Sequence, residues 1–195
     1  MRYLEPKWKS LMANTTAPIF SPEQCRQIIE VGHSQPKEIA RVGVKEKGGG
    51  AEDTKKRITH ISWIPFKALP EMYKVIENTM QRINANHFGF DNMQLNEPGQ
   101  FTEYPKGGFY DWHMDSEVNC QFEPPVRKIS MTVLLSDPSE FKGGDLEFMT
   151  QGNKPPHLIQ GQAIFFASFI RHRVAKVTKG VRRSLVMWFN GPPFK

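Results

Sequence analysis

The chain is poor in cysteine, with only Cys25 and Cys120 among its 195 residues. The two thiols are far apart, and neither belongs to a Cys-x-x-Cys motif. A disulfide framework and a cysteine-rich structural zinc site are therefore excluded, because both need several thiols at defined spacings. We expect two free thiols in a reducing compartment.

Long apolar runs are also missing. No segment approaches the ~18 consecutive apolar residues of a membrane span, and the opening MRYLEPKWKS lacks the apolar stretch of a secretory signal. These absences favour a cytoplasmic protein without a membrane partner. No run of about five like charges occurs, so the formal net charge of +6 indicates a basic surface more than a nucleic-acid-binding tail.

The first half of the chain predicts helices, and no internal repeat or Pro/Ser-rich linker divides the sequence. Ser21-Pro22-Glu23-Gln24 combines a serine cap, a proline at the first helical position and a glutamine at the third. This pattern starts a helix that we expect to run to about Gly32. A second helix is expected over 68–88, where apolar residues recur at helical spacing.

A glycine-rich, charged loop is expected at residues 43–56, which contain four glycines. Long loops in compact domains often act as lids, and a plain surface loop is an equal alternative. Arg57 and Trp63 follow this loop and are weaker candidates for a substrate groove. We expect substrate specificity to reside in loops 43–56 and 116–126.

The chain after residue 92 predicts strands, because short runs rich in β-branched and aromatic residues alternate with Gly, Pro and Asn turns. The expected strands are 93–95, 100–104, 110–113, 128–135, 145–148, 163–168, 172–177 and 183–190, with earlier ones at 39–44 and 57–64. Many short strands favour a double sheet. We expect one α+β, mainly β domain over 1–195: helices and lead-in strands in 1–90, and a jelly-roll core in 91–195.

His113 and Asp115 form a candidate metal-binding pair. If His113 ends a strand, both side chains point to one face, because strand side chains alternate. A second histidine from a neighbouring strand would complete a set of two histidines and one carboxylate. That set leaves open coordination positions, as Fe(II) oxygenases require. His172 is a candidate for this role, although a lone histidine is usually structural.

The segment after His172 supports that choice. It turns at Lys179-Gly180 and continues into a strand on which Arg182 and Ser184 share one face. A hairpin would return this strand alongside the histidine. A guanidinium and a hydroxyl bind carboxylates well. The pair therefore predicts a ligand, such as a dicarboxylate keto acid, whose other end reaches the metal.

Five segments in order resemble the 2-oxoglutarate and Fe(II)-dependent dioxygenases of the prolyl 4-hydroxylase-like group. They are YPKGGFYDWHMD from Tyr104, RKISMTVLLS from Arg127, FKGGDLEF from Phe141, GQAIFF from Gly161 and HRVAKVTKGVR from His172. The resemblance covers about residues 93–190. It implies a double-stranded β-helix, a relative of the jelly roll.

The same resemblance implies the iron ligands, which would be His113, Asp115 and His172. Related halogenases carry Gly or Ala at the position of the carboxylate to make room for a halide. Because Asp115 is present, hydroxylation is favoured over halogenation.

A co-substrate site is implied as well. Arg182 matches the residue that binds the far carboxylate of 2-oxoglutarate, and Tyr104 matches a tyrosine that lines the co-substrate pocket. Leu134 stands where some relatives carry a carboxylate-binding tyrosine. This departure places more of the anchoring on Arg182 and Ser184.

The implied activity is hydroxylation of a prolyl residue in a peptide or protein, with release of succinate and carbon dioxide. The cofactors would be Fe(II), 2-oxoglutarate and dioxygen, with ascorbate as a candidate reductant. Two alternatives stay open. The same chemistry could act on another side chain, a free amino acid or a nucleic acid base, or the chain could be a jelly-roll binding module. The complete metal-binding set together with Arg182 disfavours the module.

Three further aromatic or sulfur side chains are expected in the core. Trp112 and Met114 alternate with the metal-binding pair and should pack on the opposite sheet face. Trp188 shares a strand face with Arg182, yet core packing is the favoured reading. Arg127 is interpreted as solvated surface charge.

Overall fold

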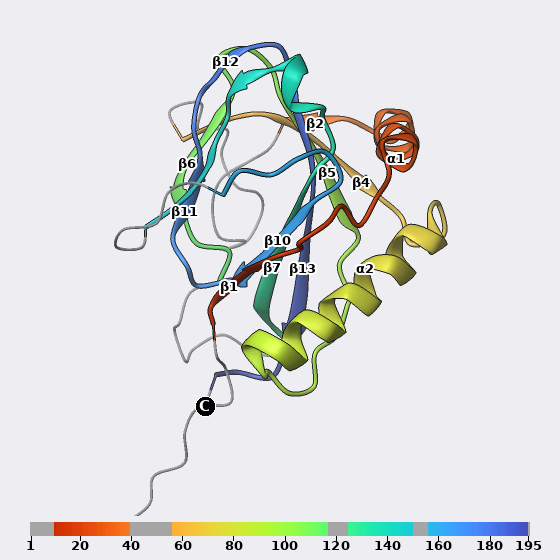
Figure 1. The fold of residues 1–195 in the computed structure, drawn as a ribbon, viewed down its shortest axis with the longest axis vertical. Helices are drawn as coiled ribbons and strands as arrows, with labels where there is room; N and C mark the ends of the chain where they lie inside the picture. Colours follow the sequence, from red (N-terminus) through yellow and green to blue (C-terminus); the bar gives the residue numbers. More distant parts are fainter. Residues whose placement is uncertain (1–9, 40–55, 117–124, 150–155, 195) are drawn as a thin grey trace, which may run out of the picture.

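Two antiparallel sheets enclose the interior of the computed structural model, which describes residues 10–39, 56–116, 125–149 and 156–194 (Figure 1). In Figure 1 the small-sheet strands β6 and β11 lie on the left, strands β7, β13 and β5 lie centrally, and helices α1 and α2 lie on the right. The helices therefore pack on the outer side of the large sheet, away from the small one. The mainly β architecture with supporting helices is as expected.

The large sheet has seven strands in the order β1-β10-β7-β13-β5-β4-β2. These are β1 (Met12–Asn14), β10 (Ala163–Ala167), β7 (Val126–Leu134), β13 (Arg182–Gly191), β5 (Gly99–Tyr104), β4 (His60–Ile64) and β2 (Glu38–Ile39). Strands from the first 90 residues thus belong to the same sheet as the later ones. The expectation of a single domain over 1–195 stays a prediction.

The small sheet has four strands in the order β3-β6-β11-β9, and a separate two-stranded sheet pairs β12 with β8. The strands are β3 (Arg57–Ile58), β6 (Phe109–His113), β11 (His172–Val174), β9 (Leu146–Phe148), β12 (Val177–Lys179) and β8 (Lys142–Gly143). A short 3₁₀ helix, η2 (Pro138–Glu140), precedes β8. All of these strand pairs are antiparallel.

The two helices begin close to where the sequence predicts them. Helix α1 (Pro22–Ser34) has the expected capping box, in which Gln24 N donates to Ser21 Oγ at 3.2 Å and Ser21 N donates to Gln24 Oε1 at 2.8 Å. Helix α2 (Pro70–Ile83) continues into a π-helical turn, η1 (Asn84–Phe88). Together α2 and η1 account for the expected helix over 68–88.

The central strands of the large sheet separate two kinds of side chain, because alternate residues point to opposite faces. The helix-facing residues are apolar and buried: Phe101, Ile129, Met131, Val133, Leu185, Met187 and Phe189. The residues between them face the small sheet and are mostly polar: Gln100, Tyr104, Ser130, Thr132, Arg182 and Ser184. Burying the apolar face stabilises the fold, whereas the polar face is available for chemistry.

Two expected strands are each divided between sheets. The run 57–64 breaks at Thr59, so that β3 joins the small sheet while β4 joins the large one. The run 172–177 likewise divides into β11 and β12. Over 93–95 the structure has only an isolated bridge from Gln94 to Asn190. The expected loop 43–56 and most of the strand 39–44 lie outside the described residues, as does Cys120.

The predicted hairpin between the histidine and arginine strands is wrong. Strand β11, which carries His172, pairs with β6 and β9, whereas β13, which carries Arg182, pairs with β5 and β7. The two residues therefore belong to opposite sheets. They still meet in one cavity because the sheets face each other.

The core assignment for Met114 is wrong as well. Its side chain is 45% exposed and lines the cavity, since the chain has already left strand β6 after His113. Trp112 is only partly buried, and the Arg173 guanidinium lies 4.8 Å from its ring centroid. No helix in the described ranges is long and apolar enough to cross a membrane. The cytoplasmic location stays a prediction.

Candidate active site

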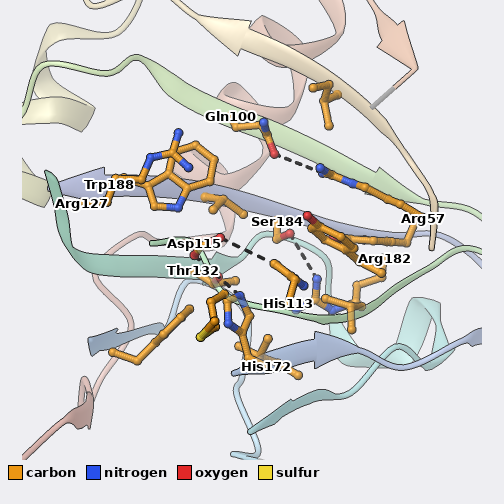
Figure 2. Close-up of a pocket in the computed structure, with 18 of the residues that line it drawn as sticks. Arg57, Gln100, His113, Asp115, Arg127, Thr132, His172, Arg182, Ser184 and Trp188 are labelled. Carbon is orange, nitrogen blue, oxygen red and sulfur yellow. Dashed lines mark hydrogen bonds and ion pairs between the residues drawn. The ribbon is translucent and has the colours of Figure 1, made fainter. Parts of the chain in front are cut away.

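A cavity of about 720 Å³ lies between the two sheets (Figure 2). Its polar and aromatic wall consists of Glu38, Arg57, Trp63, Gln100, Tyr104, Tyr110, His113, Asp115, Arg127, Thr132, Phe166, His172, Arg182, Ser184 and Trp188. Both sheets contribute to this wall. A concave site of this size with converging polar groups is typical of small-molecule binding and catalysis.

His113, Asp115 and His172 come together on one side of this cavity. His113 ends β6 and is directly opposite His172, the first residue of β11. The Asp115 carboxylate lies 3.7 Å from Nε2 of His113 and 3.6 Å from Nε2 of His172, and the three ligand atoms lie within 4.8 Å of one another. Two ligands about 2.1 Å from a shared ion can be at most about 4.2 Å apart. Both carboxylate–imidazole distances therefore fit one small cation.

Backbone carbonyls fix which nitrogen of each histidine faces the cluster. The Nδ1 atoms of His113 and His172 lie 2.7 Å and 2.9 Å from the carbonyl oxygens of Asp111 and Ile170. A carbonyl only accepts, so each Nδ1 donates and a neutral ring presents an unprotonated Nε2. This arrangement is the usual way in which proteins orient histidine ligands toward a metal.

Two buried serines hold the Asp115 carboxylate. Ser130 Oγ donates to Asp115 Oδ2 at 2.6 Å and lies 3.0 Å from Ser168 Oγ. The Asp115 backbone N–H donates to the Ser168 carbonyl at 2.9 Å. Both serines are fully buried. The side chain and backbone of the candidate ligand are thus fixed by the same neighbouring strands.

Electrostatics favour the metal-binding forms of these groups. Burial, assisted by the charge of His172, lowers the pKa of His113 to about 4, so its ring is neutral at pH 7. Burial alone would raise the pKa of Asp115, but His172, His113 and the Ser130 hydrogen bond together hold it below its ordinary value. A neutral imidazole beside an ionised carboxylate is the donor set that a divalent metal requires.

A stack of flat groups covers the His113 side of the cluster. The Tyr110 and His113 rings are stacked, with centroids 3.5 Å apart and planes inclined by 15°. The Arg57 guanidinium lies 4.3 Å from the Tyr110 ring centroid, and its Nη2 donates to Gln100 Oε1 at 3.2 Å. These contacts restrict the His113 ring and link it to the edge strand β3.

Arg182 provides a buried cation on the large-sheet side. It is 3% exposed, its Nη1 donates to Ser184 Oγ at 3.1 Å, and it pairs across the sheet with Tyr104. Among the described residues, no carboxylate oxygen lies within 4.0 Å of its guanidinium, so Arg182 has no ion-pair partner there. Burial lowers its pKa, although a guanidinium stays protonated in proteins. A buried charge without a counter-ion is costly, which indicates that an anion belongs beside it.

Arg127 and Trp188 form a third part of the wall. Arg127 donates to both carboxylate oxygens of Glu97, and its guanidinium lies 3.8 Å from the Trp188 ring centroid. Trp188 is 5% exposed, and its buried indole N–H lies close enough to Asp115 to help lower the pKa of that carboxyl. In Figure 2 this indole lies on the same side of the cavity as Asp115.

The sequence identified part of this wall and missed the rest. Tyr104, Arg182 and Ser184 lie in the cavity as expected, and Arg183 points away to Glu103. Leu134 does not line the cavity. It lies one alternation beyond Thr132 on β7 and packs into the apolar core.

The groups that the sequence missed are of two kinds: Gln100, Thr132 and Trp188 alternate with other cavity-facing residues of their strands, whereas Tyr110 and Arg127 lie beside register shifts that break the alternation. Arg127 and Trp188 were assigned to the surface and the core, whereas Gln100, Tyr110 and Thr132 were not singled out. Alternation on β5, β7 and β13 would have found the first three, once the inward face of each strand was known, but it would not have found Tyr110 or Arg127.

Residues 99–190 match the model of the 2OG-Fe(II) oxygenase superfamily, where 2OG stands for 2-oxoglutarate. This part of the chain is therefore similar to the 2OG-Fe(II) oxygenase superfamily. The match includes every member of the metal cluster and Arg182. The predicted family is confirmed, and with it Fe(II) and 2-oxoglutarate as the cofactors that the family uses. Ascorbate stays a prediction.

Relatives with similar sequences are PKHD-type hydroxylases. The chain is 36% identical over 95 residues to one from Parvibaculum lavamentivorans, covering 47% of this chain and 42% of that relative. It is 37% identical over 83 residues to one from a Synechococcus strain, covering 42% of this chain and 36% of that relative. The match thus spans about two fifths of the length of these relatives.

Solved structures share the fold at low sequence identity. The viral collagen prolyl hydroxylase of Paramecium bursaria Chlorella virus 1 superposes with a TM-score of 0.72 at 18% identity, covering 94% of this chain and 97% of that one. A prolyl hydroxylase from Trichoplax adhaerens superposes with a TM-score of 0.70 at 16% identity, covering 93% and 84%. The predicted double-stranded β-helix fold is thereby confirmed.

Proposed function

We propose that this chain is an Fe(II)- and 2-oxoglutarate-dependent dioxygenase that hydroxylates a prolyl residue in a peptide or protein. One observation carries the proposal: a buried cluster of two histidines and one aspartate faces the same cavity as the buried, unpaired Arg182. The structures with the same fold include prolyl hydroxylases, and this supports the choice of a prolyl substrate.

His113, Asp115 and His172 would hold the iron. Their three donor atoms leave three further coordination positions for 2-oxoglutarate and dioxygen. When bound, the ion supplies the redox chemistry that couples decarboxylation of 2-oxoglutarate to hydroxylation of an unactivated C–H bond. The two imidazoles and the carboxylate are already oriented, so little rearrangement opposes metal binding.

Arg182 would bind the far carboxylate of 2-oxoglutarate, with Ser184 and Tyr104 beside it. The guanidinium fork accepts a carboxylate in two hydrogen bonds, and the serine hydroxyl adds a third. Because Arg182 lies on the large sheet and the metal ligands lie on or beside the small one, the co-substrate would span the cavity. We assign Leu134 no part in this anchor, since it is not among the residues that line the cavity.

Aromatic side chains would bind the substrate ring. Trp63 and Trp188 face the cavity with ring centroids 6.2 Å apart, and Tyr110 stacks beside the candidate metal ligand His113. Aromatic, rigid walls exclude water and fit a compact, uncharged, apolar ring such as that of proline. They would hold the C–H bond that reacts close to the metal.

Turnover of 2-oxoglutarate tests the proposal. The purified protein would be incubated with Fe(II), ascorbate and 2-oxoglutarate, and succinate would be measured with and without proline-containing peptides. We expect peptide-stimulated succinate and a peptide mass increase of one oxygen atom, both abolished in His113→Ala and His172→Ala. A wild-type rate in either variant would refute the ligand assignment.

The alternatives would give different results in the same assay. Succinate stimulated by another side chain, a free amino acid or a nucleic acid base, but not by prolyl peptides, would identify another substrate class. The absence of both iron binding and succinate with every substrate would favour the jelly-roll binding module.

A further inference from the structure

Arg57 is a cavity-lining cation with an unmet hydrogen-bond donor. Its Nη2 donates to Gln100, a neutral acceptor, and its guanidinium plane covers the Tyr110 ring. Its Nε is buried and has no hydrogen-bond partner in the described part of the chain. In Figure 2 Arg57 enters the cavity from the side opposite Trp188 and Arg127.

The other two arginines of the cavity wall have an assigned partner. Arg127 is neutralised by Glu97, and Arg182 is the proposed anchor for 2-oxoglutarate. Among the described residues, no carboxylate oxygen lies within 4.0 Å of the Arg57 guanidinium to form an ion pair. A partly buried guanidinium with an unsatisfied N–H is costly unless a ligand supplies an acceptor. Carboxylates are the preferred partners of such a fork.

The co-substrate does not fill this role. 2-Oxoglutarate has two carboxylates, one used at the metal and one at Arg182, so no third one remains for Arg57. Arg57 also belongs to the other sheet: it stacks on Tyr110, which in turn stacks on His113, although its charge acts on the Tyr104 hydroxyl as that of Arg182 does. Arg57 therefore lies beyond the ring of a candidate metal ligand, on edge strand β3 of the small sheet.

We propose that Arg57 recognises a carboxylate of the substrate, so that the preferred substrate is an acidic peptide. The carboxylate would be an Asp or Glu side chain next to the reacting proline, or the C-terminal carboxylate of a peptide that ends there. This inference rests on the proposed prolyl hydroxylation. It adds that Arg57 selects substrates with a negative charge at one position near the reacting proline.

Matched peptides test the rule. One pair differs only by Asp against Asn beside the proline, and a second pair differs only by a free against an amidated C-terminus. Hydroxylation is measured as kcat/KM, and binding is measured separately by fluorescence anisotropy of labelled peptides with the protein loaded with Mn(II) and 2-oxoglutarate. A charged hydrogen bond predicts a preference of about ten- to a hundredfold for the carboxylate in one of the pairs.

Variants of Arg57 assign the preference to this residue. Arg57→Gln should reduce the acid-to-amide ratio to within about twofold, whereas Arg57→Lys should keep part of it, because an ammonium keeps the charge without the fork. Arg26→Gln is the matched control, since Arg26 is exposed on α1 and pairs with Glu23. It should retain the full wild-type ratio.

Two outcomes would overturn the inference: equal kcat/KM for acid and amide in both pairs, or an unchanged ratio in a folded Arg57→Gln. Failure of the proposed function is distinguishable from both. If no peptide is hydroxylated but anisotropy shows acid-dependent binding that Arg57→Gln removes, the carboxylate site stands and prolyl hydroxylation fails.

Discussion

The hydroxyl of Ser130 donates a 2.6 Å hydrogen bond to Oδ2 of Asp115. The oxygen that accepts this bond has one lone pair fewer for a cation, so the bond favours coordination of a metal through a single carboxylate oxygen. Single-oxygen coordination keeps other positions around the ion open. A side chain that does not itself contact the metal would thus help to keep the centre open.

Replacing Ser130 with alanine should weaken metal binding about ten- to a hundredfold, the usual effect of losing a hydrogen bond to a metal ligand. The measurement is a titration with Mn(II) followed by electron paramagnetic resonance, which does not depend on turnover. Ser139→Ala, on the exposed 3₁₀ turn, is the control and should bind like the wild type. An unchanged affinity in Ser130→Ala would show that the carboxylate is held by other contacts.

Arg182→Ala should raise the 2-oxoglutarate concentration needed for half-maximal turnover about a hundredfold, because two to three charged hydrogen bonds are lost. Arg182→Lys should fall between alanine and wild type, since it keeps the charge but not the fork. Calorimetric titration of the Mn(II)-loaded protein with 2-oxoglutarate gives the same comparison without turnover. An unchanged requirement would move the carboxylate anchor to another residue.

Glu103 should make stability depend on acid pH. Burial opposes its ionisation, but hydrogen bonds from His33, Lys37 and Arg183 lower its pKa from 4.5 to about 2. Since the folded value is the lower one, the stabilisation is present above pH 4.5 and is lost as pH falls through about 2. The shift corresponds to roughly 3 kcal/mol at most.

The substitution that checks this is Glu103→Gln, measured by urea unfolding. At neutral pH the variant should be less stable than the wild type by on the order of 2 to 3 kcal/mol. The difference should shrink as the pH is lowered from 4.5 toward 2. A difference that is the same at both ends of this window would contradict a role for the ionised carboxylate.

Gly180 should tolerate no side chain in the turn before strand β13. Its φ is +69°, and a Cβ would lie 2.0 Å from the Glu140 carbonyl oxygen. Gly180→Ala should lower the free energy of unfolding by about 2 kcal/mol or more, as other strained substitutions do. Gly107→Ala is the control, because Gly107 has a φ of +88° but its nearest atom, Lys176 Cε, is 4.0 Å away. Equal losses in urea unfolding would show that backbone strain alone decides.

The metal-binding residues were the most predictable part of the site. His113 and Asp115 were predicted from strand alternation, and they do come together, although β6 ends at His113 and Asp115 lies in the segment that follows it. Arg182 and Ser184 follow from the same rule on β13. Ser21 likewise predicted the start of α1, since capping depends on neighbouring residues alone. Local rules therefore fixed local geometry.

The sheet to which each strand belongs was not predictable in this way. The run 57–64 alternates like a single strand, yet it changes sheet at Thr59, whose hydroxyl donates to the Glu103 carbonyl at 2.6 Å. That partner is distant in sequence, so no local pattern indicates the change. The hairpin expected between His172 and Arg182 failed for the same reason.

Because β11 and β13 belong to opposite sheets, the separation of His172 and Arg182 along the sequence does not set the distance between them in space. His172 and Arg182 are ten residues apart, but the space between them is set by how far apart the sheets pack. The connecting segment is itself held in place, because it contains β12, which pairs with β8, the buried Val177, and Gly180 against Glu140. The metal centre and the carboxylate anchor are coupled through the large sheet, since Ser130 on β7 holds Asp115 and Arg182 lies on the neighbouring strand β13. The width of the cavity sets the length of the co-substrate that joins them.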